Sequence, residues 1–165
     1  MEYNEKTGLL EVNREELQLK VKENKTTGSK GLLILGEPGM GKTFSIKTPR
    51  MVSAIDISVD YQAEGIETVK AKINNMITYE SGKVTIDDLG NEERVKNFGN
   101  ELDPIAFIIQ KIYAINQIAE EPIKIFMTSN FLPATLSDKY GPRVMDRLYE
   151  MVDIVNLKDT NLRRS

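Results

Sequence analysis

An eight-residue glycine-rich segment, GEPGMGKT at residues 36–43, constrains the fold of this chain more than any other feature. It directly follows the apolar run 31–35, so a buried strand is expected to lead into it. A G-x-x-x-x-G-K-T segment after a strand is typical of a loop that binds phosphates with its backbone N–H groups. An ordinary glycine-rich turn is the alternative, but it accounts for neither Lys42 nor the hydroxyl of Thr43.

Each part of this segment has an expected role toward a nucleoside triphosphate. Lys42 would neutralise the β- and γ-phosphates, and the Thr43 hydroxyl would complete the oxygen shell of a Mg²⁺ ion. The helix that begins near Lys42 adds the positive end of its dipole. The residues expected to contact ATP or ADP here are Gly36, Glu37, Pro38, Gly39, Met40, Gly41, Lys42, Thr43 and Phe44.

Apolar runs alternate with helical patterns along the 165 residues. This alternation predicts an α/β fold of the P-loop NTPase type, a five-stranded parallel sheet flanked by helices. Pro49 is expected to end the helix after the phosphate loop early. We expect residues 1–30 to form a helix (9–23) and a linker, residues 31–165 to form the core, and no separate lid domain. The expected strands cover 31–35, 52–58, 83–87, 123–128 and 152–156, and the clearest helices cover 63–78 and 104–119.

Composition excludes several classes of function. The chain has no cysteine and no histidine, so disulfides, Cys/His zinc sites and histidine-based catalysis are ruled out. Its formal net charge of −3 provides no general attraction to nucleic acid. The N-terminus is too charged for a signal peptide, and no apolar run approaches the ~20 residues of a membrane span. We therefore expect a cytoplasmic protein without membrane contact.

Two adjacent carboxylates, Asp87 and Asp88, close the expected strand 83–87. In an open parallel sheet, ligands bind beyond the carboxyl ends of the strands. Asp87 is therefore expected to reach the Mg²⁺ ion or its water shell, and Asp88 to polarise the attacking water. A pair of acids that caps a helix or lies in a solvated loop is the alternative.

Two further segments carry polar groups suited to ATP hydrolysis. The strand 123–128 is followed by Ser129 and Asn130, and the Asn130 amide could orient water against the γ-phosphate, although such residues also commonly end strands. Arg143 and Arg147 are spaced i, i+4 on a short predicted helix and could reach a neighbouring subunit's phosphates. Ordinary ion pairs on the protein surface are the alternative for both arginines.

The order of these segments resembles that of an AAA+ ATPase of the DnaC/IstB group of helicase loaders and transposon accessory ATPases. The segments that carry the resemblance are GEPGMGKT, TIDDLG, MTSN and YGPRVMDRL, within about residues 31–164. The resemblance implies that Asn130 is sensor 1, that Arg147 is an arginine finger acting in trans, and that Arg163 is the arginine of sensor 2. Asp88 departs from the glutamate usual in AAA+ enzymes, and its shorter side chain implies slow hydrolysis.

Taken together, these features predict an ATP-binding, slowly hydrolysing ATPase that assembles head to tail and assists DNA replication as a DnaC-like helicase loader. An IstB-like transposition ATPase, a nucleotide-gated scaffold with little turnover and a small P-loop kinase are the alternatives. The expected partners are further copies of the chain, a replicative helicase or transposase, and single-stranded DNA. The nearest basic and aromatic candidates for contact with single-stranded DNA are Lys70, Lys72, Arg94, Lys96 and Phe98, which could equally form a solvated face.

Overall fold

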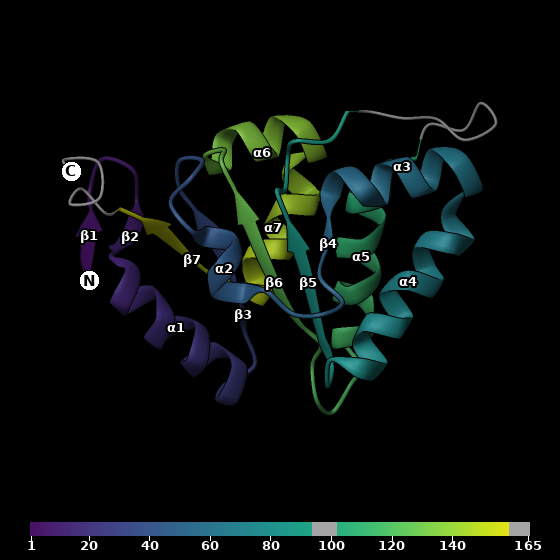
Figure 1. Cartoon of the computed structure of the whole chain (residues 1–165), viewed down its shortest axis with the longest axis horizontal. Coiled ribbons are helices and arrows are strands. Elements are labelled where there is room, and N and C mark those ends of the chain that lie inside the picture. The colour runs from purple at the N-terminus through teal and green to yellow at the C-terminus, as the bar shows by residue number, and fades with distance from the viewer. Residues whose placement is uncertain (94–101, 159–165) are drawn as a thin grey trace.

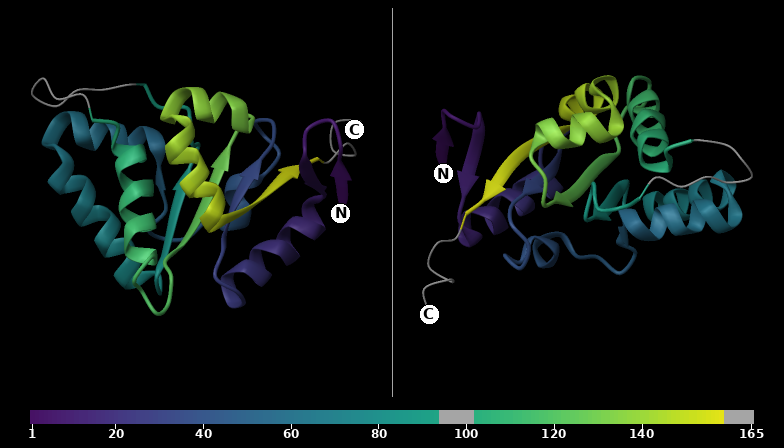
Figure 2. Two further views of the ribbon diagram at one scale, coloured as in Figure 1. Left: turned by 180° about the vertical axis from the view of Figure 1, so that it is seen from behind. Right: turned by 90° about the horizontal axis from the view of Figure 1, so that it is seen from above.

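A computed structural model describes residues 1–93 and 102–158 of the chain. One mixed sheet runs through the molecule, with helices on both faces (Figures 1 and 2). Its strands are β1 (Glu2–Asn4), β2 (Leu9–Val12), β3 (Gly31–Leu35), β4 (Val52–Ser53), β5 (Lys83–Asp87), β6 (Lys124–Ser129) and β7 (Val152–Leu157). The helices are α1 (Arg14–Thr26), α2 (Lys42–Ile46), α3 (Ala54–Glu64), α4 (Ile66–Tyr79), α5 (Pro104–Asn116), α6 (Pro133–Tyr140) and α7 (Pro142–Met151).

The strand order is β1-β2-β7-β3-β6-β5-β4, and every neighbouring pair is parallel except β1 with β2. The expected α/β class is therefore confirmed, but the sheet of the described residues has seven strands and one antiparallel pair, where five parallel strands were expected. β3, the strand that leads into the phosphate loop, lies in the middle of the sheet between β7 and β6. Because β3, β5 and β6 are parallel, the polar residues that follow them meet at one edge of the sheet.

Two apolar layers enclose the sheet, because side chains alternate between its faces along each strand. Leu32 and Ile34 of β3 pack with α1 and α2 in the smaller layer. Leu33 and Leu35 face the larger layer, to which α3, α4, α5, α6 and α7 contribute. All four β3 side chains are buried, as expected for a central strand of a parallel sheet. None of the helices in the described residues is long and apolar enough to cross a membrane.

The expected strand 52–58 is wrong beyond Ser53, because helix α3 begins at Ala54. The Ser53 side chain accepts a hydrogen bond from the Asp56 N–H at 3.0 Å and so caps this helix. Ala54, Ile57 and Tyr61 are buried at helical spacing against the larger core layer. Serine followed three residues later by aspartate was the signal for a helix start, and the β-branched residues around it, Val52, Ile55 and Ile57, obscured it.

The N-terminal residues contribute strands as well as the expected helix. Residues 9–12 form β2 instead of the first turn of a helix, and β1 pairs with β2 in a short hairpin at the edge of the sheet. Helix α1 begins after Asn13, whose side chain accepts from the Glu16 N–H at 2.9 Å, while the Glu16 carboxylate accepts from the Asn13 N–H at 3.0 Å. This capping box fixes the helix start.

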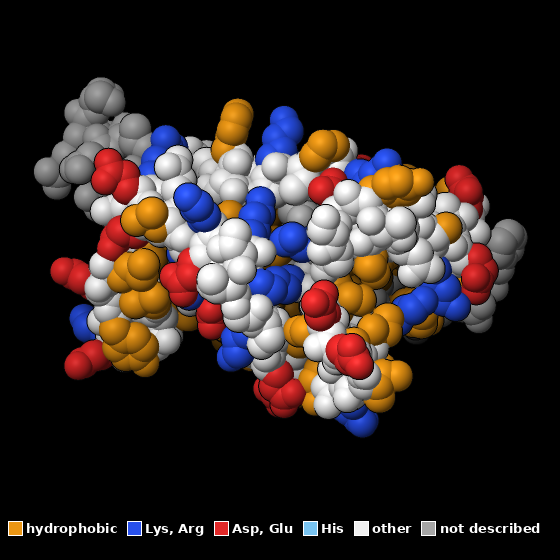
Figure 3. Space-filling view, turned by 90° about the horizontal axis from the view of Figure 1, so that it is seen from below, with side chains coloured by type: hydrophobic (Ala, Val, Ile, Leu, Met, Phe, Trp, Pro, Cys, Tyr) orange, Lys and Arg blue, Asp and Glu red, His pale blue; other side chains and the backbone are white. Residues whose placement is uncertain are grey.

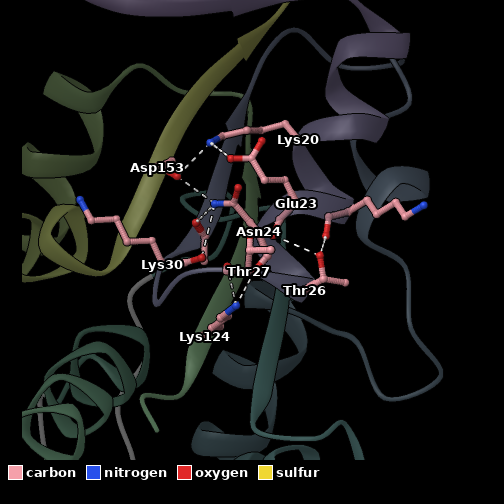
Figure 4. Close-up of polar contacts among 10 residues, drawn as sticks. Lys20, Glu23, Asn24, Thr26, Thr27, Lys30, Lys124 and Asp153 are labelled. Atoms are coloured by element: carbon pink, nitrogen blue, oxygen red, sulfur yellow. Dashed lines mark hydrogen bonds and ion pairs between the residues drawn. The ribbon is translucent and has the colours of Figure 1, made fainter.

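A polar network ties α1 to the amino end of the sheet (Figure 4). The buried Asn24 amide donates to the Gly31 carbonyl at 2.8 Å and to the Asp153 carboxylate at 2.9 Å. Lys20 also contacts Asp153, at 3.1 Å. The Lys124 ammonium donates to the carbonyls of Asn24 and Thr27 at 2.7 and 3.0 Å. α1, β3, β6 and β7 are thereby joined by groups that satisfy one another.

Basic side chains gather near the centre of the face seen in Figure 3, which views the molecule from the amino end of the strands. Lys83 of β5 and Lys124 of β6 are direct partners in the parallel register. Burial and, secondarily, the like charge of Lys83 lower the pKa of Lys124. The two main-chain carbonyls at the end of α1 offset this cost, because they accept hydrogen bonds from the charged form.

Candidate nucleotide-binding site

The phosphate loop connects the carboxyl end of β3 to α2, as the sequence predicts. Gly39 and Gly41 have φ angles of 79° and 86°, in the left-handed region that glycine adopts without strain. A side chain at Gly41 would also be crowded, because an added Cβ would lie 3.2 Å from a guanidinium nitrogen of Arg14. α2 ends at Ile46, so the short helix expected before Pro49 is confirmed.

Lys42 is buried beneath the loop, where its ammonium donates to the carbonyls of Gly36 and Glu37 at 2.8 and 2.7 Å. Burial lowers its pKa, and the carboxylates of Asp88, Asp87 and Glu37 oppose that shift in this order of size. The ammonium is thus held by weak acceptors at the place where a triphosphate would offer stronger, charged ones.

Thr43 and Asp87 are brought together as expected for a shared metal ion. The Thr43 hydroxyl donates to Asp87 Oδ1 at 2.8 Å, and the Thr128 hydroxyl donates to the same oxygen at 2.5 Å. The described residues contain no cluster of three or more acidic, histidine or cysteine side chains. One hydroxyl and one carboxylate nevertheless fit Mg²⁺, which usually retains waters and binds substrate phosphates besides one or two protein ligands.

Asp88 follows β5 in a strained conformation. Its φ angle of 57° is unusual for a residue other than glycine, and its N–H donates to the Thr128 hydroxyl at 3.0 Å. Thr128 therefore contacts both acidic residues, a role that sequence reasoning did not assign to it. Burial, followed by the negative charge of Asp87, raises the pKa of the Asp88 carboxyl. A raised pKa makes a carboxylate a better proton acceptor.

A cavity of about 350 Å³ lies between the phosphate loop, the end of β5 and the end of β6. The predicted residues that meet there are Pro38, Gly39, Gly41, Lys42, Thr43, Asp88 and Asn130, whereas Gly36, Glu37 and Asp87 are not among the lining residues. Asn91 was missed, because nothing in its spacing marks a ligand, although it follows the acidic pair in the same loop. The cavity is lined by Pro38, Gly39, Gly41, Lys42, Thr43, Asp88, Asn91 and Asn130.

Other predicted site residues lie apart from the lining of this cavity. The Phe44 side chain is 84% exposed, with the Lys47 ammonium 5.8 Å from the centre of its ring. Met40 packs against the smaller core layer, and its carbonyl accepts from Arg14 at 3.2 Å. Arg163 lies outside the described residues.

The two arginines of α7 differ in their surroundings. Arg143 is exposed, whereas Arg147 is half-buried with its guanidinium carbon 5.1 Å from the centre of the Tyr113 ring on α5. Neither arginine is among the residues that line the cavity of its own chain. A contact of Arg147 with a nucleotide would thus have to be made with a neighbouring molecule, which stays a prediction.

The lysines considered for nucleic-acid contact are engaged within the chain. Lys70 pairs with Glu67 at 3.1 Å and lies 5.5 Å from the Phe107 ring centre, and Lys72 pairs with Asp60. The other candidates, Arg94, Lys96 and Phe98, lie outside the described residues. The described residues around α4 therefore present two cations whose charges are partly offset by acids.

The sequence matches no protein family model, and comparison with curated proteins finds no match. Among solved structures, the chain is similar to domain III of the replication initiation protein DnaA from Thermotoga maritima, with a TM-score of 0.50 and 16% sequence identity. The similarity covers 87% of this chain and 61% of that one. At this identity the likeness bears on the fold alone, and it does not separate the DnaC/IstB group from other AAA+ ATPases. The chain therefore shares the α/β fold of that domain, with a phosphate loop after the central strand β3.

Proposed function

We propose that this chain binds ATP with Mg²⁺ and hydrolyses it slowly, as a DnaC-like helicase loader that assists DNA replication. The observation that carries the proposal is the convergence of Lys42, the Thr43–Asp87 pair, Asp88 and Asn130 around one cavity. The likeness to a domain of a replication initiation protein supports the ATPase fold, and the role in replication rests on the resemblance to the DnaC/IstB group. The resemblance to the DnaC/IstB group supports the loader assignment within that role.

Each residue has a task in the proposed hydrolysis. The backbone N–H groups of the loop and the Lys42 ammonium bind the phosphates, and Thr43 and Asp87 hold Mg²⁺. The metal, when bound, neutralises charge on the phosphate oxygens. Asp88 accepts a proton from the attacking water, and the Asn130 amide orients that water toward the γ-phosphate.

Slow turnover follows from the position of Asp88. Its side chain is one methylene shorter than glutamate, and its strained backbone is fixed by the hydrogen bond to Thr128, so the carboxylate cannot advance freely. The same observation favours a second candidate, a nucleotide-gated scaffold that binds ATP but barely hydrolyses it. An IstB-like role in transposition shares the site chemistry and differs only in the partner protein.

Arg147 supplies the final charge in trans. α7 carries it on the surface opposite the layer of α1 and α2, and the Tyr113 ring limits its rotamers. In a head-to-tail assembly this guanidinium would reach the γ-phosphate of the next subunit, where an arginine finger stabilises transition-state charge. Such heterologous contacts generate rings or open helices.

Calorimetry and turnover assays test the proposal. The purified chain should release or absorb heat when ATP or ADP is added in magnesium buffer, and an absence of binding would overturn the proposal. Hydrolysis with and without a single-stranded oligonucleotide then separates the candidates. Stimulation by DNA supports a loader, minimal turnover under both conditions supports a scaffold, and turnover that requires an acceptor molecule supports a kinase.

Arg147→Ala should lower kcat by about 10³-fold, the usual effect of losing an arginine finger, with ATP affinity nearly unchanged. Asp88→Asn should also be inactive, because the water loses its proton acceptor. If the finger acts in trans, a mixture of the two inactive variants should recover part of the activity, since it contains interfaces with an intact site and an intact finger. Failure of Arg147→Ala to lower turnover would contradict the intersubunit role.

A further inference from the structure

A buried carboxylate lies directly beyond the nucleotide site and has no role in the hydrolysis proposed above. Glu92 is only 5% exposed, although an unpaired buried charge is strongly unfavourable. Its partner is the hydroxyl of Tyr140, which lies 2.8 Å from Oε1 and 2.5 Å from Oε2. Tyr140 is itself buried and is the last residue of α6. We call this pair the Glu92–Tyr140 clasp.

The clasp holds the loop of residues 88–92. The Gly90 N–H donates to the Tyr140 hydroxyl at 2.9 Å and to Glu92 Oε1 at 3.0 Å. The Lys139 ammonium donates to the Glu92 carbonyl. Gly90 has a φ of 97°, and a Cβ there would lie 2.7 Å from the Phe131 ring, so the loop is closely packed as well as hydrogen-bonded.

The other end of this loop is fixed by β6. The Leu89 N–H donates to the Thr128 carbonyl at 2.8 Å, and the Ser129 hydroxyl donates to the Leu89 carbonyl at 2.6 Å. Asp88 and Asn91, the two loop residues that line the cavity, are therefore placed by contacts on both sides. Of these contacts, those made by Tyr140 and Lys139 come from α6.

The clasp also connects the loop to the helix that carries the proposed arginine finger. Gly141, with a φ of 92°, separates Tyr140 from α7, and the proposed finger, Arg147, lies seven residues beyond Tyr140. A shift of the α6–α7 junction would therefore move Gly90 and Glu92, because the Tyr140 hydroxyl is hydrogen-bonded to both. Conversely, a shift of Asp88 or Asn91 on nucleotide binding would be transmitted to α7.

We infer that Glu92 and Tyr140 are positioning residues that couple the Asp88–Asn91 loop to α7. The inference rests on the proposed ATPase function and deepens it. The clasp touches neither nucleotide nor metal, so its loss leaves ATP binding intact. Its loss instead allows Asp88, which accepts the proton of the attacking water, to move. The position of Arg147 then no longer depends on whether ATP or ADP is bound.

Three substitutions test this role. Tyr140→Phe removes only the bridging hydroxyl, and we expect kcat to fall at least tenfold while the Kd for ATP stays within about twofold. Glu92→Leu, which removes both acceptor oxygens, should behave in the same way. Glu92→Gln keeps an oxygen that accepts from Tyr140 and should restore kcat to within about threefold of the wild type.

Association is measured in parallel, as the mass in solution with ADP or with a non-hydrolysable ATP analogue. We expect any difference in mass between the ADP sample and the ATP-analogue sample to be lost in Tyr140→Phe and Glu92→Leu. The same difference should be kept in Glu92→Gln. This readout applies even if the wild type turns over very slowly. The matched control is Tyr149→Phe on α7, because the buried Tyr149 hydroxyl makes no hydrogen bond to the described loop residues 88–92.

The outcomes separate the inference from the proposed function. A wild type that binds no ATP overturns both. If the wild type binds ATP, but a folded Tyr140→Phe protein keeps its kcat and its nucleotide-dependent association within twofold, the clasp has no coupling role and the proposed function stands. If Tyr140→Phe does not fold, equal loss of kcat in Glu92→Gln and Glu92→Leu would overturn the inference, because the conservative variant failed to rescue.

Discussion

The two ends of the central sheet use buried polar groups in opposite ways. At the amino end, Asn24, Asp153 and Lys124 satisfy one another and the ends of α1 and β3 (Figure 4). At the carboxyl end, the Lys42 ammonium donates to two loop carbonyls, and Asp88 is held in a strained conformation. The first arrangement stabilises the fold, whereas the second leaves charges that a ligand can satisfy better.

The carboxyl groups at the two ends reflect this difference in their pKa values. For Asp153, burial raises the pKa, but hydrogen bonds from Asn24 and Lys20 and the charges of Lys20 and Lys30 outweigh it, so the net shift is downward. For Asp88 and Glu92, burial dominates and the pKa of each is raised. The opposite shifts indicate that the carboxylate at the amino end is compensated within the chain, whereas the two at the carboxyl end are not, and in this sense we call the amino end complete and the carboxyl end incomplete.

The largest expected effect comes from Lys42→Met, which removes the cation at the incomplete end. Hydrogen bonds to charged groups contribute about 1.5–3 kcal/mol each, so loss of the contacts to phosphate should raise the Kd for ATP by about a hundredfold or more. Stability should change little, because only two loop carbonyls lose a donor. Calorimetric titration with ATP in magnesium buffer measures the first effect, and urea unfolding measures the second.

Lys124→Met is the matched control for that substitution, since it removes a partly buried lysine from the complete end of the same sheet. Its ammonium also donates to two main-chain carbonyls, but these lie at the end of α1, and neither they nor Lys124 are among the residues that line the cavity. We expect stability to fall by about 1 kcal/mol and the Kd for ATP to stay within twofold. Equal effects of the two substitutions on ATP binding would contradict the division between the two ends.

Asn24→Ala should give the largest loss of stability at the amino end, about 2 kcal/mol, because it removes the side-chain donor to the Gly31 carbonyl and leaves the Asp153 carboxylate with Lys20 as its remaining side-chain donor. For a chain of this size, that loss corresponds to a fall in Tm of about 4–8 °C. ATP binding should be unchanged. Asn75→Ala, at an exposed position of α4, is the control and should leave Tm nearly unaltered.

The sequence predicted the carboxyl end of the sheet better than the amino end. Lys42, Thr43, Asp87 and Asn130 could be placed because parallel strands deliver the residues that follow them to one edge. The amino-end network could not be foreseen, because Asn24 and Asp153 are 129 residues apart and carry no motif. Residues 9–12 were likewise assigned to a helix, since their pairing as β2 with β7 depends on that distant strand.

Within the site, sequence reasoning missed residues that no phosphate-binding motif includes, above all those that hold other side chains in position. Thr128 and Asn91 resemble the polar residues that end most strands or fill most loops. Glu92 would be read as a solvated surface acid, because its burial depends on Tyr140, 48 residues later in the chain. A motif fixes the groups that touch a phosphate, but contacts between distant segments determine which side chains hold those groups in place.

The smallest expected effects are the pH dependences of stability, and they should differ in sign between the two ends. The lowered pKa of Asp153 means that its contribution is present above about pH 4, the range of an unfolded aspartate, and is lost as pH falls through its folded pKa. Asp153→Asn should therefore destabilise the protein at pH 7 and have less effect at pH 3, in urea unfolding at both values.

The raised pKa of Glu92 reverses that expectation. Its contribution is fully present below about pH 4.3 and is lost as pH rises through its folded pKa, because the buried charge is opposed by burial and by Asp103 more than it is favoured by Tyr140 and Lys139. Glu92→Gln, neutral at every pH, should thus be at least as stable as the wild type at pH 7, and this advantage should disappear on acidification. Destabilisation by Glu92→Gln at pH 7 that matches Asp153→Asn would show that both ends are equally complete. The contrast between a structural and a functional end would then have to rest on Lys42 alone.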